Sequence, residues 1–400
     1  MDTYVPYGAY WSTPFARWQG ALAHLHSLEF AANVAATELE KRAIPSAEID
    51  FGVLGTTVPQ PHCFYGLPWV MGMMGASAVG GPTINQACAT SARCLQTAAQ
   101  EVALDQASCA LVVAADRTSN GPHLYYPDPS GFGGSGQTET WVLENFQCDP
   151  FAGVAMVETA ENVARKYGVS TAEQHDVTLL RFGQYAQARA GAFQKRYMTL
   201  PFAVPDARLR RTQSELSADE GVFETSAEKL AQLRPVLPDG TVTSGGQTHP
   251  ADGNAGMLVT TQARARDLAS VPEIEVKLSG FGQARAEKAF MPEAPVPAAR
   301  RALHDAGTNM RDVALVTTHN PFAVNDVVFA RELDFPLERM NAHGCSLIWG
   351  HPQGPTGLRS VIELIEGLAE RGGGIGLFSG CAAGDTAMAL VVEVTDARRT

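Results

Sequence analysis

The chain has 400 residues, of which 45% are hydrophobic and 18% are charged, so it can bury large cores and form about two or three domains. The formal net charge of -12 at pH 7 excludes a global positive field that would attract nucleic acid or an anionic membrane. Seven scattered cysteines without CxxC spacing argue against a disulfide framework and a structural zinc site, and they indicate a reducing, cytoplasmic compartment.

The N-terminal segment lacks a basic start followed by an apolar core. No uninterrupted apolar run reaches the roughly 20 residues that a membrane span needs. We therefore expect a soluble protein without a membrane span and without a nucleic-acid partner.

The first part of the chain alternates helical and strand patterns. Apolar residues recur at helical spacing in residues 28–43, and the apolar run at 51–58 predicts a buried strand. Residues 88–104 again place apolar side chains on one helical face, and the run at 109–115 predicts another buried strand. This order predicts a mixed α/β fold.

Residues from about 119 to 248 differ in character. They begin with a Gly-, Pro- and Tyr-rich stretch and continue into amphipathic helices, one of which begins with capping-box spacing at Ser170 and Glu173. We interpret this segment as an inserted cap or lid domain, because long insertions are often functional. The alternative is a packing insertion with no part in the chemistry.

The last part of the chain repeats the alternation of helices and strands that is predicted for the first part. A helical pattern at 297–307 leads to an apolar strand at 313–319, and a second helix then precedes an apolar strand at 387–394. Asn85-x-x-Cys88 and Asn341-x-x-Gly344 share a local frame. The pattern favours an internal duplication, although βαβ units also resemble one another by chance.

Cys88 lies where an extended segment meets the start of a helix, among small residues. The free N–H groups and positive dipole end of a helix N-terminus stabilise a thiolate, and the same donors can hold the oxyanion of a thioester. Cys88 is therefore a candidate nucleophile. The alternative is a small buried hydrophobe, which is the more common role of a single cysteine.

Three further motifs carry residues suited to chemistry. His351 lies in a Gly-rich turn at 350–357, where a neutral imidazole can take the proton of a thiol. Cys381 lies in a turn of small residues between two predicted strands, and His319 directly follows the apolar run VALVTT at 313–318. A histidine in a loop is otherwise often solvated or capping.

Together these motifs resemble those of the thiolase family over nearly the whole chain. The resemblance rests on NQAC at 85–88, HNPF at 319–322, GHPQGPTG at 350–357 and SGCAAGD at 379–385. It implies a thiolase fold, with duplicated βαβαβαββ halves in five α/β/α/β/α layers and an inserted loop domain. The implied domains are an N-terminal half at 1–118 plus 249–272, a CoA-binding loop domain at 119–248 and a C-terminal half at 273–400.

The resemblance also implies roles for single residues. Cys88 takes the acyl group, His351 activates its thiol, and Cys381 moves a proton at the α-carbon of the second acyl-CoA. The backbone N–H groups of Cys88 and Ala383 hold the thioester oxyanion, as does His351 with a partner from the HNPF turn. The substrates are coenzyme A thioesters, and no cofactor or metal is expected.

Some residues depart from the family pattern. His319 stands where many members have Asn, which resembles the subgroup of sterol-carrier thiolases that accept larger or branched acyl chains. The turn of Cys381 lacks the usual Gly run and ends in Asp385, whose role is open.

Several further residues are candidates for binding or packing. Thr248 falls where the family has a Ser near the pantetheine arm, although a turn-stabilising hydroxyl is an equal alternative. The residues that could shape an acyl pocket, or simply fill the core, are Phe322, Trp349, Trp11 and Tyr10. The remaining cysteines, interpreted as packing residues, are Cys63, Cys94, Cys109, Cys148 and Cys345.

Two other functions fit parts of this pattern. A decarboxylative ketosynthase would use a Cys-His-His set, but Cys381 would then be superfluous. A partner-dependent or non-catalytic subunit of a larger complex is the second alternative. We expect a thiolase-type enzyme that acts as a homodimer or homotetramer, with a small accessory subunit left open.

Overall fold

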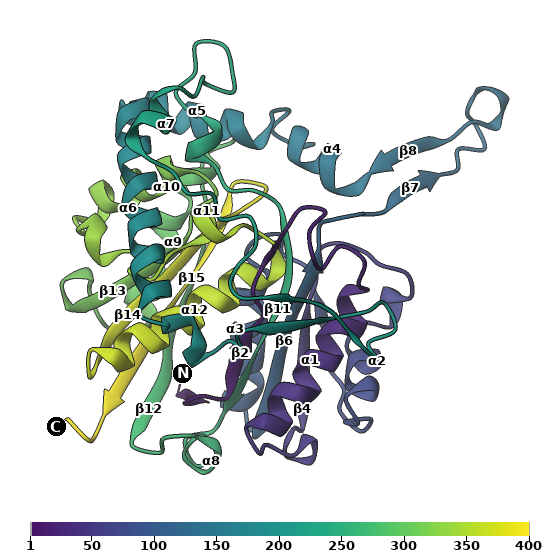
Figure 1. The fold of residues 1–400 in the computed structure, drawn as a ribbon, viewed down its shortest axis with the longest axis vertical. Helices are drawn as coiled ribbons and strands as arrows, with labels where there is room; N and C mark the ends of the chain where they lie inside the picture. Colours follow the sequence, from purple (N-terminus) through teal and green to yellow (C-terminus); the bar gives the residue numbers. More distant parts are fainter. Residues whose placement is uncertain (1, 400) are drawn as a thin grey trace.

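The computed structural model describes residues 2–399, and one mixed sheet runs through it (Figure 1). The strand order is β13-β14-β15-β12-β1-β11-β6-β4-β5, and β2 and β3 also pair with β11. The first half of the chain supplies β1 (Thr3–Pro6), β2 (Tyr10–Ser12), β3 (Ala16–Arg17), β4 (Phe51–Gly55), β5 (Thr83–Ile84) and β6 (Cys109–Arg117). The remaining strands of the sheet are β11 (Ala251–Thr260), β12 (Ile274–Arg285), β13 (Val313–His319), β14 (Gly373–Ala382) and β15 (Thr386–Asp396).

Helices form three layers, between which the two halves of this sheet lie. The outer layers are α1 (Ser27–Lys41) with α2 (Gly66–Met73) on one side and α9 (Pro295–Asp305) with α10 (Ala323–Leu333) on the other. The central layer is α3 (Thr90–Ala103) with α12 (Gly354–Glu370), which contact each other and strands of both halves. The predicted five-layer α/β/α/β/α arrangement is therefore confirmed.

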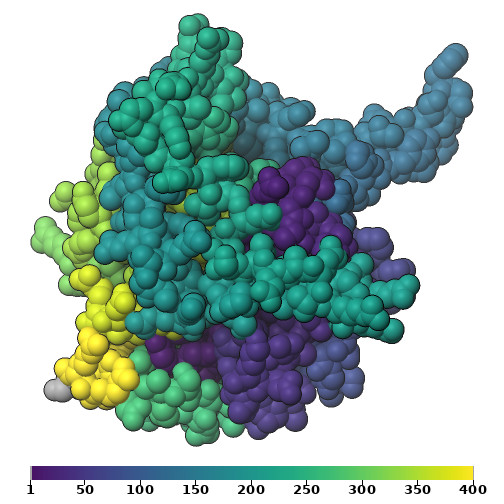
Figure 2. All heavy atoms as spheres, in the orientation of Figure 1, coloured from purple at the N-terminus to yellow at the C-terminus, as the bar shows by residue number. Residues whose placement is uncertain are grey.

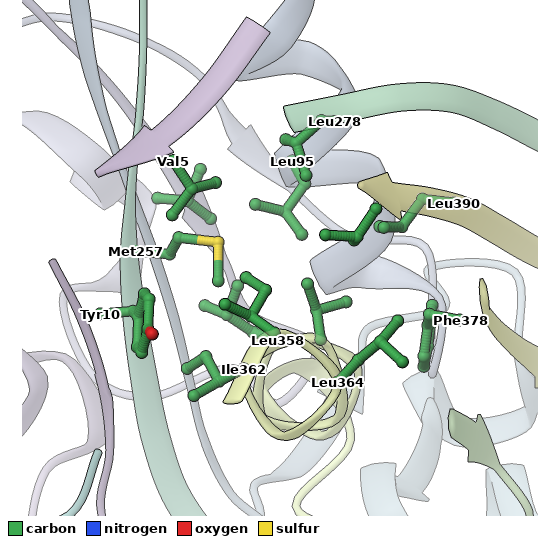
Figure 3. Close-up of a cluster of buried hydrophobic side chains, with 14 of the residues drawn as sticks. Val5, Tyr10, Leu95, Met257, Leu278, Leu358, Ile362, Leu364, Phe378 and Leu390 are labelled. Carbon is green, nitrogen blue, oxygen red and sulfur yellow. The ribbon is translucent and has the colours of Figure 1, made fainter. Parts of the chain in front are cut away.

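The central layer forms because α12 is buried on every side. Its apolar residues include Leu358, Ile362 and Leu364, which pack with Leu95 of α3 and Met257 of β11 in one hydrophobic cluster (Figure 3). A helix that is buried around its whole circumference must be covered on all faces, and two sheets with a second helix provide that cover. The first residues of α3 and α12 are thereby held close to each other.

The two halves repeat one order of elements. The first half runs β1-α1-β4-α2-β5-α3-β6-β11, and the second runs β12-α9-β13-α10-α12-β14-β15 with its third strand reduced to a bridge between Val316 and Met340. The frame shared by Asn85 and Asn341 recurs in backbone bridges of the same offset, 86 with 88 and 342 with 344. The duplicated halves expected from the sequence are present.

The chain between β6 and β11 leaves the layers and carries mostly helices. It comprises β7 (His123–Tyr126), β8 (Gln137–Thr140), α4 (Trp141–Gln147), α5 (Met156–Tyr167), α6 (Thr171–Ala190), β9 (Phe202–Pro205), β10 (Thr212–Leu216) and α7 (Ala227–Ala231). The hairpin β7–β8 projects from the body as an arm (Figures 1 and 2). The proposed limits of three domains stay a prediction.

Helix α6 begins at the predicted capping box. The Ser170 side chain accepts a hydrogen bond from the Glu173 N–H, and the Glu173 carboxylate accepts one from the Ser170 N–H at 2.9 Å. Further along α6, Arg181 forms a fully buried ion pair with Asp326 of α10, with 2.7 Å between Nε and Oδ2. This pair joins the inserted segment to the second half.

The short helix α8 (Gln262–Leu268) connects β11 to β12, and α11 (Ser346–Trp349) precedes the turn before α12. No helix within residues 2–399 is both long and apolar enough to cross a membrane. All seven cysteines are free. Cys94, Cys109 and Cys345 are buried, as expected of packing residues, but Cys148 is exposed, so the prediction is wrong for Cys148.

Candidate active site

Cys88 lies in the sharp turn between β5 and α3. Ala87 has a positive φ of 46°, which turns the extended chain toward the helix that begins at Thr90. The Thr90 hydroxyl holds this turn, because it accepts from the Gln86 N–H at 2.9 Å and donates to the Ala87 carbonyl at 2.7 Å. The Cys88 thiol is presented directly before the first turn of α3.

His351 faces Cys88 from the other half of the chain. Its Nε2 lies 3.1 Å from the Cys88 Sγ, and its Nδ1 lies 2.6 Å from the hydroxyl oxygen of Thr356. The backbone of His351 donates to the His249 carbonyl at 2.8 Å, next to the start of β11. The imidazole is thus fixed at both ends, with one nitrogen directed at the thiol.

Burial sets the charge state of this pair. It raises the pKa of Cys88 to about 11, although the backbone N–H groups of Ala383 and of Cys88 itself oppose this rise. Burial also lowers the pKa of His351 well below its usual value. The resting pair is therefore a neutral thiol beside a neutral imidazole, which is the form that can act as a base.

His319, at the end of β13, lies beside His351. The two rings are stacked, with 4.0 Å between their centroids and 29° between their planes. The His319 Nδ1 lies 2.9 Å from the Ser346 hydroxyl, whereas its buried Nε2 has no partner among the described residues. Burial lowers the pKa of His319 to about 3, so the ring is neutral.

Cys381, near the end of β14, is fully buried. Its sulfur accepts a hydrogen bond from the Asn325 Nδ2 at 3.4 Å. Burial and the nearby Cys88 raise the pKa of Cys381 well above its usual value. Asn325 was not found from the sequence, since it lies in the first turn of α10 and nothing in its surroundings marks it.

A cavity of about 670 Å³ reaches the pair formed by Cys88 and His351. Phe322, Thr248 and Ala383 also line it, whereas His319 and Cys381 are fully buried behind its wall and do not. Its walls are mostly apolar, and helix α4 contributes Trp141, Val142, Asn145, Phe146 and Gln147. The cavity suits a ligand that combines a long apolar part with a few polar contacts.

Three predicted pocket residues lie elsewhere. Trp349, Trp11 and Tyr10 are buried in hydrophobic clusters and do not line the cavity. Trp349 instead packs on the Arg359 guanidinium, at 4.2 Å from its ring. The core interpretation of these three aromatic residues is the correct one.

Asp385 has a structural position. Its Oδ2 accepts from the Ala289 N–H at 2.9 Å and its carbonyl from the Ala286 N–H at 2.7 Å, so it fixes the segment that follows β12.

Asp116, at the end of β6, is a buried acidic residue that was not recognised from the sequence. Its position directly after a buried apolar run was the available signal.

Cys88, His319 and His351 form the one group of described residues whose donor atoms lie close enough together to hold a metal ion. The sulfur of Cys88 and one nitrogen each of His319 and His351 lie within 4.8 Å of one another. Binding an ion there would occupy the thiol and the base that faces it.

The chain is similar to known proteins along almost its full length. Residues 9–263 match the family described as "Thiolase, N-terminal domain" and residues 273–394 match "Thiolase, C-terminal domain". An acetyl-CoA acetyltransferase of Chromobacterium violaceum is 29% identical over 95% of this chain and 97% of that protein. A probable acetyl-CoA acyltransferase of Staphylococcus aureus is 28% identical over 98% of this chain and 99% of that protein.

Solved structures agree with this match. The acetyl-CoA acetyltransferase of Bacillus anthracis superposes with a TM-score of 0.89 at 25% identity, covering 98% of each chain. Human mitochondrial 3-ketoacyl-CoA thiolase has the same fold, with a TM-score of 0.90 at 24% identity over 98% of this chain and 99% of that one. Since both family descriptions together span nearly all of its residues, this chain belongs to the thiolase family and is a thiolase-type acyltransferase.

Proposed function

We propose that Cys88 carries the acyl group of a coenzyme A thioester and that His351 is the base that deprotonates it. The observation that supports this most directly is the 3.1 Å contact between the Cys88 Sγ and the His351 Nε2 at the cavity wall. Proton transfer to a positioned neutral imidazole is the usual way to activate such a thiol. Coenzyme A is the expected substrate, since a related structure, the human mitochondrial thiolase, holds it.

In the cleaving direction, the Cys88 thiolate attacks the 3-oxo carbon of a 3-oxoacyl-CoA. The bond between C2 and C3 breaks, and the carbanion at C2 receives a proton from the Cys381 thiol. The acyl group stays on Cys88 until the thiol of free CoA takes it, which releases the shortened acyl-CoA. The Claisen condensation of two acyl-CoAs is the reverse sequence through the same residues.

The oxyanions formed on this path need donors. The backbone N–H groups of Cys88 and Ala383 lower the pKa of the Cys88 thiol against the effect of burial, which supports the proposal that they hold the thioester oxygen. The unpartnered Nε2 of His319 supports the same role for that ring together with His351. Thr248 and Phe322 are proposed to contact the substrate, because both line the cavity.

The test is intact-protein mass spectrometry after incubation with acetyl-CoA and with 3-oxoacyl-CoAs of several lengths, followed by peptide mapping. An acyl adduct on Cys88 supports the proposal. Cys88→Ser should abolish the adduct, whereas Cys381→Ala should keep it and stop carbon–carbon bond chemistry. Equal loss of the adduct in both variants would contradict the division of roles, and no adduct with any donor would favour a partner-dependent or non-catalytic subunit.

We also propose that His319 marks the subgroup related to the sterol-carrier thiolases. The support is its position, stacked on His351 with a ring nitrogen within 4.8 Å of the Cys88 sulfur. His319→Asn restores the residue that is commoner in the family. The idea fails if His319→Asn leaves both the turnover and the preference among acyl chains unchanged.

A decarboxylative condensing enzyme is the second candidate, and the observation that favours it is the Cys-His-His set. Decarboxylation generates the carbanion without a base, so it leaves Cys381 and its bond from Asn325 without a task. Release of carbon dioxide from malonyl-CoA by the purified chain would favour this candidate over a thiolase.

We propose that the reaction needs no metal or other cofactor. An ion held by Cys88, His319 and His351 would occupy the proposed nucleophile and base, so it would inhibit the reaction. Turnover should therefore persist after dialysis against EDTA. Loss of turnover on dialysis, restored by Zn²⁺, would contradict the proposal.

A homodimer or homotetramer in the cytoplasm stays our proposal, with a small accessory subunit as a further possibility. Support for assembly comes from the arm β7–β8, where Tyr125, Tyr126 and Phe132 are exposed, Phe132 completely. Support for a reducing compartment comes from the seven free cysteines. Light scattering of the purified chain tests assembly, and a monomer at micromolar concentration would contradict it.

A further inference from the structure

Asp116 stands at the end of β6, where it is almost completely buried, with 1% of its surface exposed. Its Oδ1 accepts hydrogen bonds from the N–H groups of Thr57 and Val58 at 2.7 and 2.9 Å and from the Thr56 hydroxyl at 3.0 Å. Its Oδ2 accepts from the Thr57 hydroxyl at 2.9 Å and from the Gly354 N–H at 2.8 Å. One carboxylate thus joins two segments that are far apart in the sequence.

Gly354 is the first residue of α12 and lies three residues after His351. Its carbonyl oxygen accepts a hydrogen bond from the Ser91 hydroxyl, which is three residues after Cys88 in the first turn of α3. The residue is therefore held on both sides: Asp116 binds its N–H and Ser91 binds its C=O. These two bonds fix the turn of His351 against the segment of Cys88.

The other segment that Asp116 holds forms part of the cavity wall. Thr57 and Val58 line the cavity, and the Thr57 carbonyl accepts a hydrogen bond from the indole N–H of Trp141 at 2.9 Å. Asp116 therefore connects the wall beside the substrate to the turn that carries the proposed base. None of its hydrogen-bond partners is charged.

We propose that Asp116 is a positioning residue, which keeps the imidazole of His351 aligned with the thiol of Cys88 by holding the N–H of Gly354. The inference rests on the proposed function, because it takes Cys88 and His351 as the reacting pair. A misplacement of about 1 Å can cost about 100-fold in rate. The loss of one bond at Gly354 should therefore reduce turnover more than it reduces substrate binding.

The charge of Asp116 provides a second, independent test of this positioning role. The carboxylate lies close enough to raise the pKa of Cys88 and also that of Cys94. Removing the charge while keeping the shape should make the thiol of Cys88 easier to deprotonate. Loss of alignment should therefore lower turnover. Loss of the charge should instead make simple alkylation of the thiol faster at a given pH.

Asp116→Asn is the informative variant. Its carbonyl can replace Oδ1, but its NH₂ group would face the Gly354 N–H, where two donors cannot bond. We expect kcat to fall about 10- to 100-fold with KM nearly unchanged, while alkylation of Cys88 by iodoacetamide shifts to lower pH. A kcat within twofold of wild type, or an unshifted alkylation profile, overturns the proposal.

The matched control is Glu161→Gln on helix α5. Glu161 is also buried, with 6% of its surface exposed, and its carboxylate accepts from the N–H groups of Thr241 and Val242 at 2.8 and 2.7 Å and from the Thr241 hydroxyl at 3.0 Å, none of which belongs to the turn of His351. This variant should keep the wild-type kcat and alkylation profile. An equal fall in kcat in both variants would show a general effect of buried amides and would also overturn the proposal.

Gly354→Ala tests the same contact from its other side and serves if Asp116→Asn does not fold. A Cβ at Gly354 would lie 2.7 Å from the Asp116 Oδ2, so the turn must move while the charge stays. We expect a lower kcat with an unshifted alkylation profile, and an unchanged kcat contradicts the proposal. Failure of the proposed function is distinguishable, because wild-type protein would then form no acyl adduct on Cys88.

Discussion

At the scale of single residues, the site depends on two neutral side chains rather than on a preformed ion pair. Cys88 and His351 are in contact, yet burial raises the pKa of the thiol to about 11 and lowers that of the imidazole. The charged forms are costly in this environment unless a substrate carbonyl accepts the developing charge. Cys88 should therefore be sluggish toward simple alkylating reagents at neutral pH.

This predicts a steep pH dependence for alkylation of Cys88 by iodoacetamide. Below a pKa of about 11 the thiolate fraction grows about tenfold per pH unit, so the rate should still rise between pH 8 and pH 10. Peptide mapping follows the Cys88 adduct, and Cys88→Ser provides the blank. A rate that levels off below pH 8 would instead show a thiolate–imidazolium pair in the resting enzyme.

The residues recognised from the sequence share one property. Cys88, His319, His351 and Cys381 each lie in a local motif whose composition carries the signal, and the structure brings the first three within 4.8 Å. Asn325 could not be recognised in this way, and the sequence signal for Asp116 was only its place after a buried apolar run, because the partners of both residues come from other elements. Which groups a buried Asn or Asp contacts is decided by tertiary packing, not by its neighbours in the chain.

At the scale of elements, α12 combines an apolar surface with buried charge. Arg359 forms two bonds to Asp219, the shorter at 2.6 Å between Nη1 and Oδ1, and one of 3.1 Å to Glu363. One cation thus faces two carboxylates in the interior. Burial consequently raises the pKa of Glu363 to about 7 despite the cation and the Tyr197 hydroxyl beside it.

The raised pKa predicts how stability depends on pH. Because the folded pKa of about 7 exceeds the ordinary value of 4.5, the contribution of Glu363 is fully present below pH 4.5 and is lost as the pH rises through 7. The loss is on the order of 3 kcal/mol, and Glu363→Gln should lack it. Guanidinium denaturation at pH 5 and pH 8 measures both proteins, and identical pH dependence would contradict the prediction.

Helix α4 is a second element whose role can be tested. Five of its seven residues line the cavity, and Trp141 has the largest side chain among them. Trp141→Ala should raise kcat/KM for long relative to short 3-oxoacyl-CoAs by about 10-fold, because it makes room for further methylenes. Leu143→Ala, on the exposed side of the same helix, is the control. An unchanged ratio in Trp141→Ala would rule out α4 as a determinant of chain length.

The prediction of elements from the sequence was uneven for a physical reason. The helices and strands of the layers have clear apolar periods, because each of them buries a defined face against its neighbours. The elements α1, α3, β4 and β6 lie where these patterns indicated. The arm β7–β8 was not anticipated. Its burial pattern is mostly exposed, so the alternation that normally identifies a half-buried strand is missing from its sequence.

At the scale of the whole molecule, the inserted segment is joined to the second half by buried polar contacts. Asp326 binds Arg181 and also accepts hydrogen bonds from Thr318, Asn320 and Asn341. Removing the carboxylate would leave the buried Arg181 charge with only neutral partners, the carbonyls of Leu337 and Met340 and the side chain of Gln184. The contacts between the segment and the layers are thus specific as well as apolar.

Asp326→Ala should therefore destabilise the protein by about 3–5 kcal/mol. Glu332→Ala removes an exposed ion pair, that between Arg300 and Glu332 at 3.5 Å, and should change stability by less than about 1 kcal/mol. Denaturation midpoints of the two variants give the comparison. Similar small effects in both would mean that water or other polar groups replace the lost carboxylate.

The joining of the two halves at the site has a kinetic consequence. Cys88 and His351 are separated by 263 positions and meet only when both halves and the central helices are in place. Closing so long a loop is slow compared with forming the local helices, so helical signal should recover early during refolding. The capacity of Cys88 to become acylated should return last, so the amount of acyl adduct at each time reports how far the final step of assembly has gone.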